Sequence, residues 1–444
     1  MTLAYDNVAY HDRRGPIEYV AITTAGVHHG GAGGAGGRRS AAIGGLNEKG
    51  LGVVYAASGD LLDRSEMPPD AVRGDLCAYS LANFSTVPEF EAFLDETNER
   101  GRQHHGRVFA LMDAEGNAAV YELGRHHYVK YDANDPETAP DGFIVRASFS
   151  LSGAGLGEPP TPAAARARPD EKLQRYFKAH RLWESAVQRN ELDYRFVIRK
   201  VARDLSDPEG EPYPIPVEGT AGEIRPAHER TLGRDTPPPG TIPLAQHLIA
   251  ARASVSVGVV HGVKPGEDPA LSTFWAMLGH PLFTVAVPCW TRTRGTSAEL
   301  WTPARSPICD VSLDMRWDNS YEHPPDSGLP PHPFVERYYL RTERLNDIWG
   351  IIYPAEDRIF DMTDEKLAEW REELPNPMQM RQFHEDVAWR ALRALLFAAD
   401  ETGTASVDPE VLEQRRAFER MTDRERRVKQ ALDSGRRPNP VYWW

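Results

Sequence analysis

The chain has 444 residues, of which 41% are hydrophobic and 26% are charged, and its formal net charge at pH 7 is −14. A chain of this length and apolar content can bury the core of one large domain or of two to three smaller ones. An acidic chain lacks the basic surface of nucleic-acid and anionic-membrane binders, so we expect neither partner. The three cysteines, Cys77, Cys289 and Cys309, have the wrong number and spacing for a disulfide framework or a zinc site.

Targeting and cofactor signals are not found in the sequence. No stretch approaches the roughly 20 apolar residues of a membrane-spanning helix, and residues 1–14 do not resemble a signal peptide. We therefore expect a cytoplasmic protein, or an exported one if a further segment precedes Met1. The glycine run at 26–37 contains a G-x-G-x-x-G pattern, but residues 38–45 are too short and glycine-bounded for the helix that a dinucleotide site needs. We expect a surface loop there and no cofactor.

Six strands are predicted in the first third of the chain from their β-branched and aromatic residues and from the turn residues between them. They span residues 17–24, 51–57, 107–112, 118–123, 127–131 and 142–150. The glycine-rich turn at 44–50 leads into the second strand, whose apolar side chains predict burial on both faces. Short turns separate the last four strands, which are therefore expected to form an antiparallel meander.

Helices are predicted where apolar residues recur at spacings of three and four. Residues 75–94 predict two short helices, the second of which begins at a capping box formed by Thr86 and Glu89. A helix at 171–186 carries a mostly aromatic stripe on one face, and another helix is expected at 194–205. The stripe consists of Leu173, Tyr176, Phe177, His180 and Trp183.

The second half of the chain changes from strands to helices. Residues 206–240 predict a long loop, and core strands are expected at 254–263, 272–278 and 282–288. Charged helices follow at 364–373, 383–398 and 409–432. Because strands precede the helical block instead of alternating with it, we predict an α+β fold with a pair of antiparallel sheets.

Common catalytic and metal-binding motifs are not found. The sequence has no G-x-S-x-G, H-E-x-x-H, P-loop or C-x-x-C pattern. Histidine doublets occur at 28–29, 104–105 and 126–127, but neighbouring residues of a strand point to opposite faces. We therefore expect no metal site. Cys77 and Cys289 lie in apolar stretches and are expected to be core residues rather than reactive thiols.

Several separate stretches, in order, carry a resemblance to a known group of enzymes. They are Gly45–Leu51 (GLNEKGL), Leu81–Glu89 (LANFSTVPE), Met112–Glu122 (MDAEGNAAVYE), Val145–Ser150 (VRASFS) and Lys264–Pro269 (KPGEDP). Over roughly residues 1–300 the chain resembles the choloylglycine hydrolase, penicillin acylase and acyltransferase (peptidase C45-like) branch of the N-terminal nucleophile (Ntn) hydrolases. The resemblance implies a four-layer αββα sandwich of two antiparallel sheets. Because the C-terminal part changes to longer, charged helices, we predict a core at 1–320 and a mainly helical C-terminal extension at 321–444, which packs on that core.

The resemblance also implies an activity and a set of site residues. Ntn hydrolases cleave linear amides with an N-terminal Cys, Ser or Thr, whose own α-amine accepts the proton. Asp6 matches the acid that steadies this amine, Ser148 stands where an oxyanion asparagine is expected, and Arg252 matches the arginine that borders the site. The N-terminal cysteine itself is not found in this sequence. Thr2 takes its place only if Met1 is removed, and it lies too close to Asp6 for the spacing of the family.

Three alternatives therefore remain open. The chain is an Ntn-type hydrolase or acyltransferase whose nucleophile-bearing segment lies before Met1, or a relative without a nucleophile that binds an acyl or peptide-like ligand. Alternatively, it is an unrelated α+β binding protein. In the first two cases the partner is a small-molecule amide or acyl compound. The terminal pair Trp443 and Trp444 fits either packing on the core or contact with a second subunit in a homo-oligomer.

Overall fold

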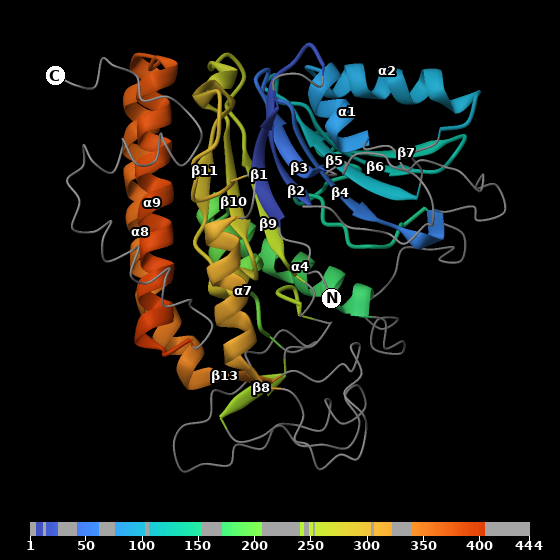
Figure 1. The fold of residues 1–444 in the computed structure, drawn as a ribbon. Helices are drawn as coiled ribbons and strands as arrows, with labels where there is room; N and C mark the ends of the chain where they lie inside the picture. Colours follow the sequence, from blue (N-terminus) through green and yellow to red (C-terminus); the bar gives the residue numbers. More distant parts are fainter. Residues whose placement is uncertain are drawn as a thin grey trace, which may run out of the picture.

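The computed structural model describes residues 6–11, 15–24, 42–61, 76–102, 106–152, 171–206, 240–243, 248–251, 254–302, 306–321 and 339–404. These residues form four layers, which are a pair of helices, a large antiparallel sheet, a small antiparallel sheet and a second group of helices (Figure 1). The predicted α+β class and the αββα order of layers are thus confirmed. The division at residues 320 and 321 stays a prediction.

The larger sheet has seven antiparallel strands that follow one another in chain order. They are β1 (Asp6–His11), β2 (Tyr19–Thr24), β3 (Ala42–Asn47), β4 (Gly52–Ala57), β5 (Arg107–Met112), β6 (Ala118–Leu123) and β7 (Tyr128–Asp132). Alternate residues face opposite sides, so Tyr19 and Ala21 pack toward one helical layer while Val20 and Ile22 pack toward the smaller sheet. The predicted meander is correct from β5 to β7. Its predicted last strand at 142–150 is wrong, because this segment is irregular and lies outside the sheet.

Helices α1 (Leu76–Asn83) and α2 (Val87–Asn98) cover the outer face of this sheet, and two side chains attach them to it. Asn47 accepts hydrogen bonds from the backbone N–H groups of its own turn and donates to the carbonyl oxygens of Leu81 and Phe84, at 2.9 and 2.8 Å. Asp113, in the turn between β5 and β6, accepts from the N–H of Val87 at 2.9 Å. Both residues belong to stretches that carry the family resemblance, and both have a structural role here.

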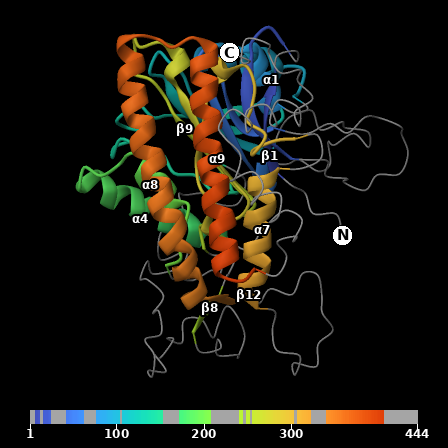
Figure 2. The ribbon, with the colours of Figure 1, turned by 60° about the vertical axis from the view of Figure 1, so that its left-hand side comes forward.

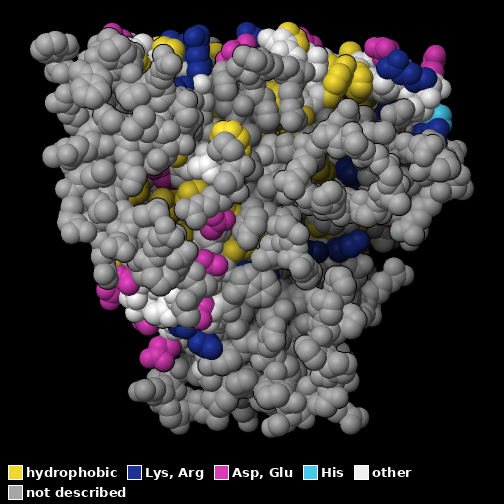
Figure 3. Space-filling model, viewed as in Figure 1, with side chains coloured by type: hydrophobic (Ala, Val, Ile, Leu, Met, Phe, Trp, Pro, Cys, Tyr) yellow, Lys and Arg dark blue, Asp and Glu magenta, His cyan; other side chains and the backbone are white. Residues whose placement is uncertain are grey.

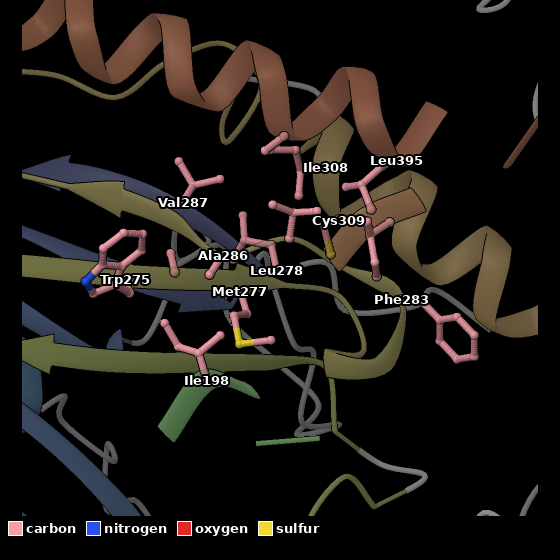
Figure 4. Packing of buried hydrophobic residues seen from close by; sticks show 14 of the residues in the cluster. Ile198, Trp275, Met277, Leu278, Phe283, Ala286, Val287, Ile308, Cys309 and Leu395 are labelled. Atoms are coloured by element: carbon pink, nitrogen blue, oxygen red, sulfur yellow. The ribbon is translucent and has the colours of Figure 1, made fainter. Parts of the chain in front are cut away.

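The smaller sheet contains β9 (Ser256–His261), β10 (Thr273–Leu278) and β11 (Val287–Cys289), with β10 in the middle. Every residue of β10 is buried, and Trp275, Met277 and Leu278 lie in the largest core together with residues of the helices (Figure 4). Gly52 of β4 lets the two sheets approach closely, because a Cβ there would lie 2.7 Å from Val260 Cγ1 of β9. Within the smaller sheet, Gly258 of β9 makes room for a neighbour on β10, since a Cβ there would lie 2.9 Å from the ring of Phe274.

Three helices form the layer outside the smaller sheet. They are α7 (Pro307–Asn319), α8 (Thr342–Glu372) and α9 (Pro377–Glu401), and α8 and α9 run side by side (Figure 2). Asn376 and Gln379 form a capping box at the start of α9. The predicted helices at 364–373 and 383–398 are correct in type, although α8 and α9 begin earlier than expected.

None of the helices in the described ranges is long and apolar enough to span a bilayer.

The remaining elements lie around the sheets. They are α4 (Glu171–Gln188), α5 (Tyr194–Phe196), a π-helical turn (Val197–Val201), and a small sheet of β8 (Thr241–Pro243), β12 (Ser320–Tyr321) and β13 (Tyr339–Arg341). Several predicted segments lie outside the described residues, namely the glycine run 26–37, almost all of the loop 206–240, the helix 409–432 and the last two tryptophans.

A buried carboxylate explains why the strand predicted at 282–288 is short. Glu356 of α8 is fully buried, binds both terminal nitrogens of Arg203 at 2.7 and 2.8 Å, and accepts from the N–H of Ala286 at 2.7 Å. Arg203 in turn donates to the carbonyl oxygens of Pro281 and Thr284. These side chains satisfy backbone groups that would otherwise pair with a neighbouring strand. The strand β11 therefore begins only at Val287.

We predict that Gly52→Ala destabilises the protein by about 1–3 kcal/mol, because the added methyl group forces the two sheets apart at Val260. The measurement is urea unfolding followed by circular dichroism. Gly350→Ala is the matched control. Gly350 lies in α8, and a Cβ added there would meet nothing within 4 Å. Alanine should therefore stabilise the helix by up to about 1 kcal/mol. Equal effects of the two substitutions would contradict the close approach of the sheets.

We predict that Glu356→Gln lowers the free energy of unfolding by about 3–5 kcal/mol, because the charge of Arg203 then stays buried without a counterion. The same urea titration measures this loss. Asp386→Asn breaks an exposed ion pair with Arg390 within α9 and should change the free energy by less than about 0.5 kcal/mol. A loss at Glu356 no larger than that of the control would rule out a buried charge pair.

Candidate functional site

The residues that the sequence analysis assigned to the site are only partly within the described chain. Asp6 is the first residue of β1 and pairs with Thr24, the last residue of β2. Ser148 is half-buried in the irregular segment that follows β7. Arg252 and Thr2 lie outside the described residues, so their roles stay predictions.

The register of the larger sheet shows which ends of its strands lie together. In an antiparallel meander the start of each strand adjoins the end of the next, so the start of β1 lies at the same end of the sheet as the ends of β4 and β6. Glu122 lies near this end of β6, opposite Val108. With strands about 4.8 Å apart, three strand spacings place Asp6 about 14 Å from the end of β4.

Asp60, in the short helical turn after β4, links two segments that are distant in the sequence. Its Oδ2 atom accepts hydrogen bonds from the N–H of Ser150 at 2.9 Å and from the Ser150 hydroxyl at 2.7 Å, while its Oδ1 atom accepts from the Ser58 hydroxyl. Partial burial raises the pKa of Asp60, but the hydrogen bonds from Ser58 and Ser150 outweigh it and hold this pKa below its usual value. The ionised Asp60 therefore joins the end of β4 to the segment that contains Ser148.

Glu122 holds the same segment from the opposite side. Its side chain is fully buried, and its two oxygens accept from the N–H groups of Leu151 and Ser152, both at 2.8 Å, as well as from the Ser152 hydroxyl. Arg146 adds a contact of 3.3 Å from its Nε atom. A buried carboxylate is stable only when its charge is compensated by such donors. The N–H groups of residues 150–152 thus donate to two carboxylates instead of to a neighbouring strand.

Arg146 lies over the ring of Tyr131, with its central carbon 4.0 Å from the ring centroid. Burial raises the pKa of Tyr131, and the nearby charge of Glu122 raises it further. Burial also raises the pKa of Tyr176 on α4, while the nearby charge of Arg146 lowers this pKa and that of Glu122 raises it. The polar group at the sheet end therefore reaches the aromatic stripe of α4.

That stripe packs against the segment that contains Ser148. Phe149 contacts Tyr176 edge to face, with ring centroids 5.5 Å apart, and Phe143 contacts His180 and Trp183, at 5.0 and 5.9 Å. The three α4 side chains are half-buried, so part of each ring is exposed to solvent. The sequence analysis identified the stripe, and the structure shows that it lies against residues 143–149.

Ser148 lies between these anchored neighbours. Arg146 and Ser150, two residues before and after it, are both bound to carboxylates, whereas the Ser148 hydroxyl makes no hydrogen bond with any described residue. A fixed backbone with an unused hydroxyl is a suitable donor for a carbonyl oxygen of a ligand. We call Ser148, Asp60, Glu122, Arg146 and the α4 rings the sheet-end site.

Sequence reasoning missed Asp60, Glu122 and Arg146 as members of this site. For Glu122 a signal existed, because it is the only charged residue of the otherwise apolar segment Ala118–Leu123, and a charge inside a core strand needs a partner. Asp60 gave no such signal. Its partner Ser150 is 90 residues away, and nothing in the local sequence indicates the contact.

The cysteines and buried histidines of the described chain do not offer a reactive group. All three cysteines are buried, and burial raises the pKa of the Cys289 thiol far above its usual value. His280 and His384 are also buried. Burial lowers the pKa of His280 to about 3 and that of His384 to about 4. His384 contacts the Pro288 carbonyl with Nδ1 and accepts from the Ser297 N–H with Nε2, so it is a structural neutral imidazole.

Comparisons with known proteins find structural similarity only. No family model and no curated protein matches the sequence. Two variants of the conjugated bile acid hydrolase from Clostridium perfringens are each 15% identical to the chain. The first alignment covers 43% of this chain and 69% of the hydrolase, with a TM-score of 0.27. The second covers 42% and 67%, with a TM-score of 0.25. Penicillin V acylase from Agrobacterium tumefaciens is 14% identical, with 65% and 80% coverage and a TM-score of 0.26. TM-scores this low leave the function to be inferred from the residues of this chain.

We predict that the protein loses stability as the pH falls below about 6.5, the ordinary pKa of histidine. His280 and His384 have lowered pKa values when folded, so the unfolded chain binds their protons more tightly. Each should cost about 1.4 kcal/mol per pH unit between pH 6.5 and its folded pKa. Urea unfolding at pH 7, 6 and 5 measures the slope. His384→Asn keeps a donor for Pro288 and should reduce the slope, with His280 and the partly buried His261 accounting for the remainder. An unchanged slope would contradict the assignment.

Proposed function

We propose that this chain is the scaffold of an Ntn-type hydrolase or acyltransferase that acts on a linear amide bond, with the ligand bound at the sheet-end site. The single observation that carries the proposal is the bridge made by Asp60. The resemblance leads us to expect oxyanion donors in two stretches, residues 55–58 at the end of β4, where this chain has no asparagine, and Ser148. Asp60 binds Ser58 in the first and Ser150 beside the second. Two stretches expected to serve one carbonyl oxygen are thus held together.

The surroundings of Ser148 favour a particular kind of amide. Tyr176, His180 and Trp183 offer half-exposed rings beside Phe143 and Phe149, and such a surface suits an aromatic or other bulky apolar acyl group. The carbonyl oxygen of that acyl group would accept a hydrogen bond from the Ser148 hydroxyl. In amide cleavage this contact strengthens as the oxygen becomes negative, and removal of such a donor costs about 10²- to 10³-fold in rate.

A second candidate function is binding of such an amide without cleavage. The buried cysteines favour it, because the described residues do not include an exposed thiol that could attack the carbonyl carbon. A serine in the donor position, where the resemblance leads us to expect an asparagine, also favours it. Both candidates require the same ligand at the same site, so a binding measurement tests them together and a turnover measurement separates them.

The test is calorimetric titration of the full chain with N-phenylacetylglycine and with N-acetylglycine. We predict that the phenylacetyl compound binds more tightly and that Trp183→Ala weakens its binding about fivefold to tenfold, because an aromatic contact of about 1 kcal/mol is lost. Chromatography of the same samples detects free glycine if the amide is cleaved. Binding of neither compound, or equal binding of both, would contradict the proposed contact between the acyl group and the aromatic rings of α4.

Tyr79→Ala provides a matched control for this titration. Tyr79 lies in α1 with 46% of its surface exposed, and its ring contacts Phe84 and Phe93 on the other side of the larger sheet. Figure 3 shows hydrophobic side chains exposed at the upper right, where Figure 1 draws α1 and α2. Loss of this exposed ring should leave the affinity for N-phenylacetylglycine unchanged. A decrease equal to that of Trp183→Ala would place the ligand elsewhere.

A further inference from the structure

We propose that Asp60 and Glu122 are positioning residues, which together hold residues 146–152 so that the Ser148 hydroxyl is presented to the ligand. We call this pair the carboxylate clasp. The inference rests on the proposed function, because it concerns the same site and the same ligand. It extends that function to two acidic residues which the family resemblance does not assign to the site.

The clasp holds consecutive residues from two sides. Asp60 binds the N–H and hydroxyl of Ser150, while Glu122 binds the N–H groups of Leu151 and Ser152. Five charge-assisted hydrogen bonds thus converge on three residues when the Ser152 hydroxyl is included. Bonds to a charged acceptor are roughly twice as strong as neutral ones, so this part of the segment is fixed relative to the sheet.

A third contact fixes the other side of Ser148. Arg146 is bound to Glu122 and lies over Tyr131. Ser148 is thus the middle of a short span whose two ends are both tied to one buried carboxylate. Glu122 and Asp60 contact no ligand in this arrangement because their oxygens already accept from the segment. They act on the ligand only through Ser148.

Hydrogen exchange tests the clasp in the absence of any ligand. Glu122→Gln keeps the shape of the side chain but removes its charge, and the amides of Leu151 and Ser152 should then exchange at least about tenfold faster. Amides of α9, on the far side of the molecule, should be unchanged. Asp60→Asn tests the amide of Ser150 in the same way at the less buried carboxylate, and it replaces Glu122→Gln if that variant fails to fold. Unchanged exchange at residues 150–152 in the folded variant would overturn the clasp.

A double-mutant cycle on N-phenylacetylglycine binding tests whether the clasp acts through Ser148. We expect Ser148→Ala and Glu122→Gln each to weaken binding about fivefold to tenfold, the effect of one lost hydrogen bond, and the double variant to be no weaker than either single one. Glu122→Asp, which keeps the charge, should recover part of the affinity. Full additivity of the two substitutions would overturn the positioning role. If the wild type binds no amide, the proposed function fails, and the exchange measurement alone decides whether the clasp exists.

Discussion

The burial of one carboxylate, that of Glu122, shapes the end of the larger sheet. Glu122 lies in a strand whose other residues are apolar, so its charge must be balanced by donors that come to it. The donors come from residues 146–152, which are irregular and lie outside the meander. The irregular course of this segment is the cost of keeping that charge, and it fixes the position of Ser148.

The same constraint operates in the outer helical layer. There Glu356 is fully buried and is satisfied by Arg203 and the N–H of Ala286, so α8 is tied to the segment between β10 and β11. The two sheets meet through apolar side chains and through Gly52, where the missing side chain lets Val260 of the smaller sheet approach. Rigid layers of this kind are the usual support for a binding site formed by loops at a sheet end.

The sequence predicts the layers better than the site. Strand-forming residues and the turns between them were sufficient for β5 to β7, and the spacing of apolar residues was sufficient for α4, because each signal is local. The strands predicted at 142–150 and 282–288 fail for a common reason. Their apolar composition is compatible with a strand, but in each segment a carboxylate distant in sequence binds a backbone N–H group. Asp60 binds that of Ser150, and Glu356 binds that of Ala286. Asp60 shows the limit most clearly, since its contact with Ser150 depends entirely on the assembled sheet.

The most direct test of the central claim is a crystal structure of the full chain with bound N-phenylacetylglycine. The account predicts that the carbonyl oxygen lies within hydrogen-bonding distance of the Ser148 hydroxyl and that the phenyl ring contacts Tyr176 or Trp183. A ligand bound against α1 and α2, or at the outer helices α8 and α9 with the sheet end empty, would contradict it.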